Sequence, residues 1–237
     1  MTSYTVTATA TNNTFGGGLL KVQVLTNAAL AGSPATGSSS TAYNCSVTTT
    51  QAGSFVFGVA DNQTASTTFV ASAGCTITDQ ASINAGGAQG GAFKTTAGTG
   101  TPGATTVGSS TTFAGNYGVV AMEVLASGGT LTVDGSSPAV VTDGTSTSWT
   151  TGSFTPPAGA VLVALFTASG NGSANVCVAT VSSSPVLTWA EQVKISSTVG
   201  ATNSYAGVWT AVVPAGGAAT PQPVVAPSAA AVRAANW

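Results

Sequence analysis

Few side chains in this sequence could perform acid–base or metal chemistry. The 237 residues include six acidic residues, four basic residues and no histidine. They are Asp61, Asp79, Glu123, Asp134, Asp143 and Glu191, with Lys21, Lys94, Lys194 and Arg233. A globular surface is typically about one quarter charged residues, so this surface must consist mainly of Thr, Ser, Asn, Gly and Ala. Because proton transfer and phosphate binding depend on charged groups, the shortage argues against catalysis.

Paired carboxylates are the first chemistry to consider, because glycoside hydrolysis needs two of them held about 5–9 Å apart. Asp134 and Asp143 each precede a glycine, which is a hairpin-turn signal. Asp61 and Asp79 are expected in loops. Glu123 is expected in a buried strand, and Glu191 on the solvated face of a strand. We therefore predict no catalytic pair. A calcium site built from loop carbonyls with Asp61, or from Asp134 and Asp143, is an open alternative.

Nucleophilic catalysis and zinc binding both lack their usual residues. A serine or cysteine nucleophile needs a base, which is most often histidine. A lysine could take that role only if it were desolvated, and the lysines at positions 21, 94 and 194 are expected to point outward from strands. A structural zinc site needs four His or Cys ligands, and this chain has three scattered cysteines. We predict no enzymatic activity, no cofactor and no metal.

The three cysteines are odd in number and lack the CxxC spacing of redox or zinc motifs. They are Cys45, Cys75 and Cys177. We expect buried thiols, with a Cys45–Cys75 disulfide as the alternative.

One glycine motif and two classes of partner can be weighed from local sequence. Residues 98–103 match GxGxxG, but a dinucleotide site needs a helix directly after the motif, and the next residues are Ala-Thr-Thr-Val-Gly. We predict a glycine-rich loop. No basic cluster could neutralise phosphates, so nucleic acid is not an expected partner. No apolar run approaches the roughly 18 residues of a membrane helix, so no membrane partner is expected either.

Aromatic side chains are the remaining candidates for ligand binding. Trp149, Trp189 and Trp209 all lie in the second half of the chain, together with Trp237. Exposed tryptophans could stack on sugars, whereas buried ones would form a core or a subunit interface. We predict that the tryptophans lie in the core or in a subunit interface, because Trp189 is two residues after Leu187 and so shares a strand face with it. Trp149 is the expected exception, since its neighbours are all polar.

The elements that position these residues are predicted to be strands. Strong helix formers are scarce, while Thr, Val, Ser and Gly dominate. Apolar residues alternate with polar ones in residues 4–10 and 18–25, as in a half-buried strand. Solid apolar runs at 55–60, 117–122 and 161–166 indicate strands covered on both faces. The sequence therefore predicts an all-β fold with antiparallel, jelly-roll-like β-sandwiches.

Two weakly related halves indicate two sandwich units. Residues 46–60 and 153–166 both run from a polar strand through an Ala-Gly turn, at Gly53 and Gly159, into a buried strand. We predict an N-terminal sandwich over residues 1–130 and a C-terminal sandwich over 131–237. The final apolar stretch, residues 229–237, is expected to pair with the second sheet.

The two opening strands, residues 4–10 and 18–25, have no counterpart at the start of the second half. We expect them to extend the first sandwich. The alternative is that they cross to the second half or to a neighbouring subunit and cover an open sheet edge.

The second half also carries a distinctive series of segments. They are Ser153-Phe-Thr-Pro-Pro-Ala-Gly-Ala-Val-Leu-Val-Ala-Leu165, Thr180-Val-Ser-Ser-Ser-Pro-Val-Leu-Thr-Trp189 and Ser204-Tyr-Ala-Gly-Val-Trp-Thr-Ala-Val-Val-Pro214. Together with the opening strands, this series resembles the β-rich virion proteins of tailed bacteriophages, especially those of actinobacterial hosts, which are often labelled minor tail proteins. The resemblance carries no catalytic residues.

The resemblance implies a structural protein on the exterior of a virion, as a minor tail protein or as a decoration or fibre on the head. It implies assembly in the host cytoplasm, which agrees with an N-terminus that lacks the pattern of a secretory signal. The expected partners are other virion proteins and further copies of this chain, with a trimer favoured. The alternative function is a carbohydrate- or receptor-binding module that attaches to a host surface glycan through exposed aromatic residues.

Overall fold

The computed structural model describes residues 2–11, 15–30, 32–37, 43–62, 68–83, 88–112, 117–171, 178–199 and 202–215. These residues form seventeen strands and no helix, and the strands pair antiparallel. The all-β prediction is therefore confirmed. The described part of the chain contains no helix that could cross a membrane.

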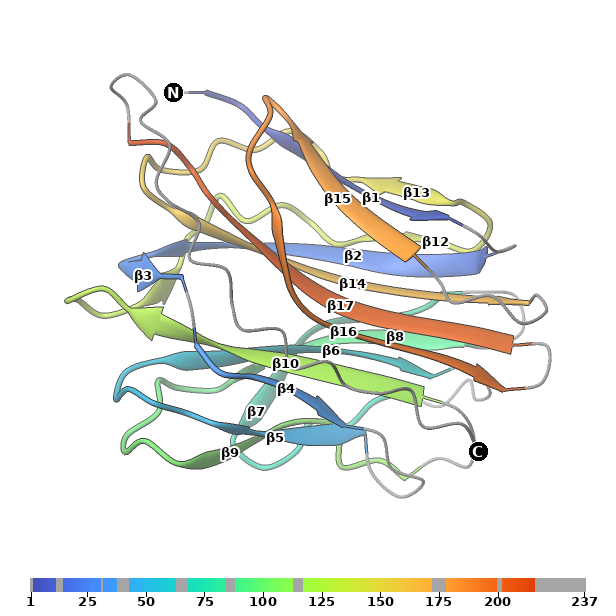
Figure 1. Ribbon diagram of the computed structural model, residues 1–237, viewed down its shortest axis with the longest axis horizontal. Helices are drawn as coiled ribbons and strands as arrows, with labels where there is room; N and C mark the ends of the chain where they lie inside the picture. The colour runs from blue at the N-terminus through green and yellow to red at the C-terminus, as the bar shows by residue number, and fades with distance from the viewer. Residues whose placement is uncertain are drawn as a thin grey trace.

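Two large sheets lie face to face at the centre of the molecule (Figure 1). The first central sheet contains, in pairing order, β3 (Ala28–Ala29), β10 (Tyr117–Ala126), β6 (Phe55–Asn62), β8 (Gln89–Thr95) and β7 (Cys75–Ser82), with β4 (Pro34–Gly37) also paired to β10. The second central sheet contains β11 (Thr132–Val133), β2 (Phe15–Thr26), β14 (Val161–Asn171), β17 (Thr202–Val212) and β16 (Ala190–Val199), with β12 (Val141–Asp143) also paired to β2.

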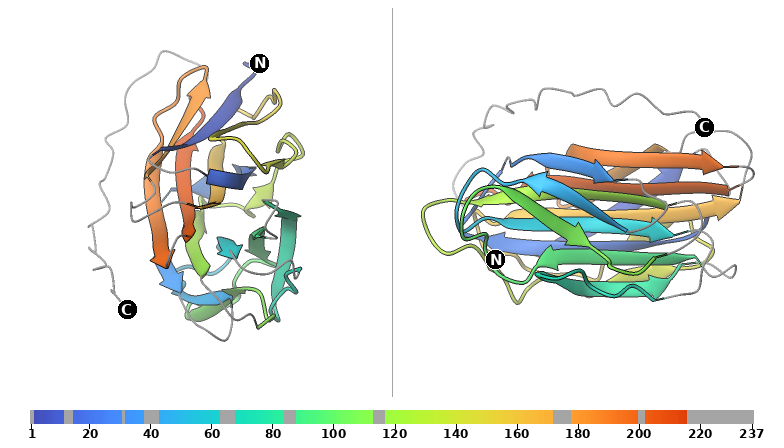
Figure 2. Two further views of the ribbon diagram at one scale, coloured as in Figure 1. Left: turned by 90° about the vertical axis from the view of Figure 1, so that its right-hand side faces the viewer. Right: turned by 90° about the horizontal axis from the view of Figure 1, so that it is seen from below.

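A small cover sheet packs on the outer face of each central sheet, which makes four layers (Figures 1 and 2). The cover sheet of the first consists of β5 (Asn44–Thr48) and β9 (Ala104–Gly108). The cover sheet of the second consists of β13 (Ser148–Thr150), β1 (Thr5–Thr11) and β15 (Val178–Ser184), in that order.

Three apolar cores fill the spaces between the four layers. Strand β14 shows why the central strands read as solid apolar runs. Its Val163 and Leu165 face the first central sheet, whereas Leu162 and Phe166 face the cover sheet. All four are fully buried, and burying one such side chain stabilises the fold by about 1.5–3 kcal/mol. Apolar residues at every position thus mark a strand between two layers.

Contrary to our prediction, the opening strands β1 and β2 do not join the first sandwich. β1 lies between β13 and β15, and β2 lies between β14 and the short strands β11 and β12. The structure therefore follows the alternative, in which they cross to the second half. The physical reason is that β9 and β10 already occupy the corresponding positions in the first sandwich.

The sheet pairing also divides the chain differently from the predicted units 1–130 and 131–237. The contiguous sandwich, as we call it, is formed by residues 28–126. The composite sandwich is formed by residues 2–26 together with 127–215. The chain passes between them at Asn27 and again at residues 127–131. The predicted pairing of residues 229–237 lies outside the described residues.

Candidate functional site

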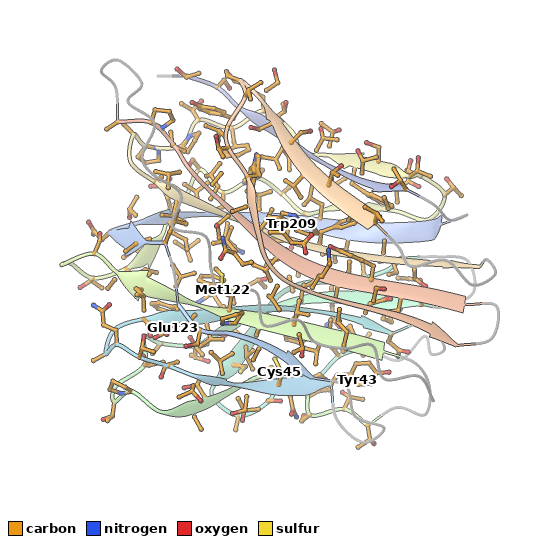
Figure 3. All side chains as sticks on the ribbon, viewed as in Figure 1. Tyr43, Cys45, Met122, Glu123 and Trp209 are labelled. Atoms are coloured by element: carbon orange, nitrogen blue, oxygen red, sulfur yellow. The ribbon has the colours of Figure 1, made fainter. Side chains whose placement is uncertain are left out.

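Glu123 lies on β10 (Figure 3) and is the acid with the most hydrogen bonds in the described structure. Its carboxylate is fully buried, as the sequence predicted. It accepts from Ser54 Oγ at 2.7 Å, from Thr50 N and Oγ1 at 2.9 Å each, and from Gln51 N at 3.3 Å. Burial acts to raise the pKa of Glu123, but these hydrogen bonds outweigh it and lower the pKa. The carboxylate therefore anchors the turn that precedes β6.

Asp61 lies inside the molecule and not in a loop, contrary to our prediction. It is the seventh residue of β6, on the same face as Phe57 and Val59, and is fully buried against the second central sheet. Ser204 Oγ, on β17, donates to its Oδ2 at 2.5 Å. Oδ1 has no hydrogen-bond partner among the described residues. Burial raises the pKa of Asp61 well above its usual value, and the Ser204 hydrogen bond offsets this only in part.

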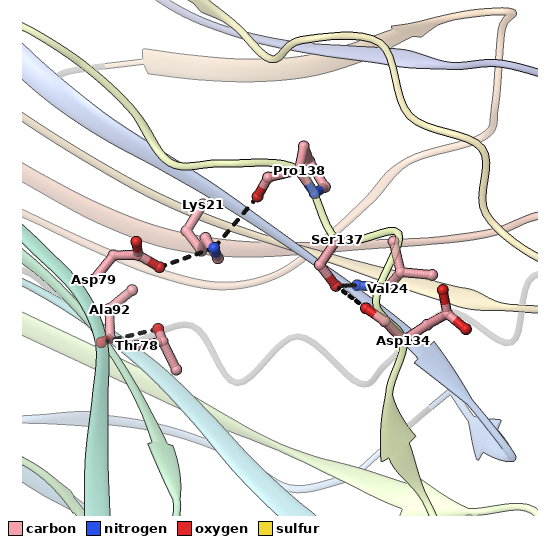
Figure 4. A network of polar contacts seen from close by, with 8 residues as sticks. All are labelled: Lys21, Val24, Thr78, Asp79, Ala92, Asp134, Ser137 and Pro138. Carbon is pink, nitrogen blue, oxygen red and sulfur yellow. Dashed lines mark hydrogen bonds and ion pairs between the residues drawn. The ribbon is translucent and has the colours of Figure 1, made fainter.

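Lys21 and Asp79 connect the two central sheets (Figure 4). Lys21 Nζ, on β2, lies 2.9 Å from Asp79 Oδ2, on β7, and donates to the carbonyl of Pro138 at 3.3 Å. The two charged side chains are only 13% and 18% exposed. We had predicted an outward lysine and a loop aspartate. The facing sheet turns this outward strand position into an interface between layers.

The two Asp-Gly acids have the turn role that the sequence predicted. Asp134 Oδ1 accepts from Ser136 N at 2.8 Å, and Asp143 Oδ1 accepts from Thr145 N at 2.7 Å. Hydrogen bonds from Ser136 lower the pKa of Asp134, and hydrogen bonds led by that of Thr145 N lower the pKa of Asp143. Among the described residues, no three Asp, Glu, Cys or His side chains lie close enough together to hold a metal ion.

The other charged residues within the described ranges lie near the surface. Glu191 and Lys194 form an ion pair of 2.8 Å on β16. Lys94 Nζ lies 5.3 Å from the centroid of the Phe55 ring, a cation–π contact. Arg233 lies outside the described residues.

Two tryptophans belong to the core of the composite sandwich. Trp149 is 1% exposed, with its ring centroid 5.0 Å from that of Phe166. Trp209 is 3% exposed and stacks on Tyr205 at 5.8 Å (Figure 3). Trp149 was the expected exposed residue, and that prediction was wrong. Its polar neighbours Ser148 and Thr150 point outward. Because successive side chains of a strand point to opposite faces, Trp149 points inward.

Trp189 is partly buried, packs against the same core and donates from Nε1 to Ser183 Oγ at 3.2 Å. Of the three candidates Trp149, Trp189 and Trp209, it is the one that is not fully buried. Trp237 lies outside them. The described tryptophans therefore do not form an exposed platform.

The cysteines and the glycine motif serve structural roles. Cys45 is buried and Cys75 is partly buried, and both are free thiols, so the alternative disulfide is not formed. Burial, with a contribution from nearby Cys75, raises the pKa of Cys45 to about 12, which makes it unreactive at neutral pH. Cys177 lies outside the described residues. Residues 98–103 form the loop between β8 and β9, and a strand, not a helix, follows them.

The outer face of the composite sandwich's cover sheet is an uncharged array of hydroxyl groups, which we call the hydroxyl face. Alternation along β1, β13 and β15 turns one side of each strand outward. Its members are Thr5, Thr7, Thr9, Ser148, Thr150, Thr180 and Ser182. Cross-strand hydroxyl pairs form between Thr7 and Thr150, with 2.8 Å between oxygens, and between Thr9 and Ser148, with 3.4 Å.

A hydroxyl group both donates and accepts hydrogen bonds, and its state does not change with pH over the range where carboxylates and amines titrate. Contacts made by the hydroxyl face would therefore depend little on salt or pH. The alternation of polar and apolar residues along β1 is sufficient to identify Thr5, Thr7 and Thr9 as members of one strand face. Their neighbours on β13 and β15, which come from the other end of the chain, could not be identified locally.

Comparisons with known proteins do not place the chain in a family. No protein-family model matches it, and no curated protein or solved structure is significantly similar to it.

Proposed function

We propose that this protein is a structural component on the exterior of a bacteriophage virion, as a minor tail protein or as a head decoration or fibre. It acts through permanent contacts with neighbouring virion proteins and with further copies of itself, a trimer being the favoured assembly. It is assembled in the host cytoplasm and performs no catalysis. The resemblance of the three quoted segments and the opening strands to phage virion proteins supports this proposal.

One structural observation supports it further: all six acidic side chains are described, and each is engaged within the molecule. Asp61 and Glu123 are buried, Asp79 and Glu191 pair with lysines, and the remaining two hold turns. The acidic groups are thus used in contacts within the chain, while the hydroxyl face provides an uncharged surface for assembly. A particle protein with such contacts would remain bound over a wide range of ionic strength.

The alternative, a glycan-binding module on the host-attachment apparatus, depended on exposed tryptophans. Since Trp149 and Trp209 are core residues, no described observation favours it, and we do not propose it.

The test is to locate the protein on the particle. Purified virions of the phage that encodes the chain are examined by mass spectrometry and by electron microscopy with an antibody against it. The proposal predicts a stoichiometric virion protein at a symmetric external position. Absence of the chain from washed virions, although it is made in infected cells, would contradict the proposal.

A further inference from the structure

The two sandwiches share one strand plan. The first central sheet has the order β10–β6–β8–β7, and the second has the order β2–β14–β17–β16. The cover sheets repeat the pattern, with β5 beside β9 and β13 beside β1. Even an irregularity recurs, because the pairing register shifts between Ile77 and Asp79 on β7 and between Glu191 and Val193 on β16.

Equivalent hydrogen bonds fix this correspondence residue by residue at the Ala-Gly turns. Gly53, with φ +81°, donates from its N–H to Thr99 O, and Gly159, with φ +76°, donates likewise to Val213 O. In return, Thr99 N donates to the residue after Gly53, and Val213 N to the residue after Gly159. The turns before β6 and β14 are therefore the same structure.

A second set of bonds identifies what β1 replaces. Thr49 N donates to Gly103 O, and Thr49 Oγ1 accepts from Gly103 N at 3.1 Å. Thr151 makes the same two bonds with Val6, the second at 3.0 Å. Val6 thus stands where Gly103 stands, at the start of the strand equivalent to β9. By the same correspondence, β2 takes the place of β10.

The chain order of these strands differs between the two sandwiches. In the contiguous sandwich β9 and β10 follow β8, so the unit completes itself. In the composite sandwich their equivalents come from residues 2–26, at the opposite end of the chain from β17. We call residues 2–26 the complementing segment. Without it, β13 and β15 would lose the strand that joins them, and β14 would have an open edge.

The complementing segment pairs only with strands of the composite sandwich, although Leu19 and Leu25 on β2 also pack in the core that is shared with the contiguous sandwich. β2 makes ten register pairs with β14, and β1 makes seven with β15. Its inward residues Val6, Ala8, Leu20, Val22 and Val24 are fully buried. Its one charged residue, Lys21, makes the ion pair with the contiguous sandwich described above. Recognition is therefore mainly by backbone hydrogen bonds and apolar side chains.

Its covalent connection to the contiguous sandwich runs through a single residue in a turn conformation. Asn27 has φ +54°, the one non-glycine residue with positive φ in the described chain. Its carbonyl accepts from Ser127 N at 2.9 Å, and its Nδ2 donates to Thr130 O at 3.0 Å. Changing the backbone at this residue would redirect both strands relative to the contiguous sandwich without altering the strand pairing that they make in a composite sandwich.

We propose that the complementing segment is an exchangeable donor: it completes the composite sandwich of a second copy of this chain as well as its own. The acceptor site is formed by residues 127–215 and is identical in every copy, so an exchanged pair keeps the native strand contacts. Within one chain the local concentration of the segment favours the closed form, and exchange gains as the protein concentration rises. This inference concerns self-assembly and does not depend on a virion location.

The test uses two full-length variants, Thr9→Cys and Thr180→Cys. These residues are register partners on β1 and β15, and both side chains lie on the accessible hydroxyl face. Paired residues in adjacent antiparallel strands have Cα atoms about 4.5–5.5 Å apart, within the range of a disulfide. The two singly substituted proteins carry different affinity tags, are mixed in denaturant, refolded together and then oxidised. Exchange predicts a covalent heterodimer joined through the two introduced thiols, located by peptide mass spectrometry.

The amount of heterodimer should rise in proportion to the refolding concentration while intramolecular closure dominates. The doubly substituted chain, refolded alone at low concentration, should form the bond within one chain, which verifies the geometry. A mixture of Thr5→Cys with Thr180→Cys controls for random oxidation and for contact between the hydroxyl faces of two copies. Both residues lie on that face, but Thr5 pairs with Ser184, four positions away from Thr180. If the double variant links only within itself and the test mixture gives no more heterodimer than the control, the proposal is wrong.

Variants at Asn27, the connecting residue, provide a second and independent experiment. Asn27→Pro cannot adopt the positive φ that the closed form requires, so it should raise the exchanged fraction several-fold at a fixed concentration. Asn27→Gly keeps that conformation accessible and should leave the exchanged fraction near that of the unaltered chain. Equal fractions in the two variants would overturn the proposal, whether or not the protein is found on virions.

Discussion

At the scale of single residues, Glu123 shows how a charge-poor protein uses a buried carboxylate. Replacing Glu123 by Gln removes the charge and turns one accepting oxygen into a donor that faces Thr50 Oγ1. A hydrogen bond to a charged group contributes about 1.5–3 kcal/mol, so we expect a loss of about 2 kcal/mol in the free energy of unfolding at neutral pH, measured with urea. Glu191→Gln, which disrupts only a surface ion pair, should cost less than about 0.5 kcal/mol.

The pH dependence gives the sign of this effect. Because the folded pKa of Glu123 is lowered, its stabilising contribution is present above the unfolded value near 4.5. It is lost as the pH falls through the folded pKa. The difference between the unaltered protein and Glu123→Gln should therefore shrink in acid. A constant difference at every pH would contradict the role assigned to the carboxylate.

Asp61 should behave in the opposite way. Its folded pKa is raised well above the unfolded value of 3.8, so the protein loses stability as the pH rises from that value towards the folded pKa. Asp61→Asn removes the titrating group, so it should stabilise the protein at neutral pH by at least about 1 kcal/mol, since each unit by which a pKa is raised corresponds to about 1.4 kcal/mol.

The measurement is urea unfolding of both proteins between acidic and neutral pH. The gain should vanish in acid, where Asp61 is protonated in both the folded and unfolded states. Asp143→Asn, at an exposed turn with a lowered pKa, should be destabilising at neutral pH instead. A destabilised Asp61→Asn protein at neutral pH would show that the carboxylate form is required between the sheets.

At the scale of elements, the hydroxyl face gives a direct test of assembly. Thr7 lies at its centre, between Thr150 on β13 and Ser182 on β15. Thr7→Lys places a positive charge on an uncharged contact surface and should shift the oligomer to monomer, because like charges of symmetry-related copies repel and an ammonium group is costly to desolvate. Light scattering after size exclusion measures the change.

The control for Thr7→Lys is the same substitution on the other cover sheet. Thr106 is exposed on β9, so Thr106→Lys should keep the oligomer, and both variants should unfold at nearly the same temperature as the unaltered protein. Equal oligomer in both variants would exclude the hydroxyl face as the contact surface.

The elements themselves could be predicted from local sequence, whereas their partners could not. Period two located β1 and β2, and solid apolar runs located β6, β10 and β14, because a strand's side chains report which of its faces is covered. They do not report what covers them. The pairing of β1 with β13 and β15 joins residues about 140–180 positions apart. The entropic cost of closing loops of such lengths changes only slowly with length, so sequence separation does not select one partner over another.

Two errors at the candidate site came from giving neighbours more weight than alternation. The pair Asp61-Asn62 resembled a turn. However, Phe57 and Val59 lie four and two residues before Asp61, on the same strand face, and so predict that the Asp61 side chain is buried. Trp149 stood among polar residues, yet those residues are its outward-facing partners. The Lys21–Asp79 contact could not be found in this way, since it depends on how the two central sheets stack.

At the scale of the whole molecule, four β-layers enclose three apolar cores. Lys21, Asp79 and Glu123 connect the layers and turns, and Asp134 and Asp143 hold turns. We therefore expect contacts with neighbouring molecules to be hydrogen-bonded and apolar. Such contacts weaken little when salt screens charges, because screening acts on ionic interactions over about 8–10 Å at physiological ionic strength.

If this chain assembles through uncharged surfaces, as we propose, the molar mass of the purified protein at micromolar concentration should be that of an oligomer at any ionic strength. Light scattering after size exclusion is run at low and at high ionic strength. The account predicts the same closed oligomer, a trimer in the favoured case, under both conditions. A monodisperse monomer at both ionic strengths, or an oligomer that dissociates on adding salt, would contradict it.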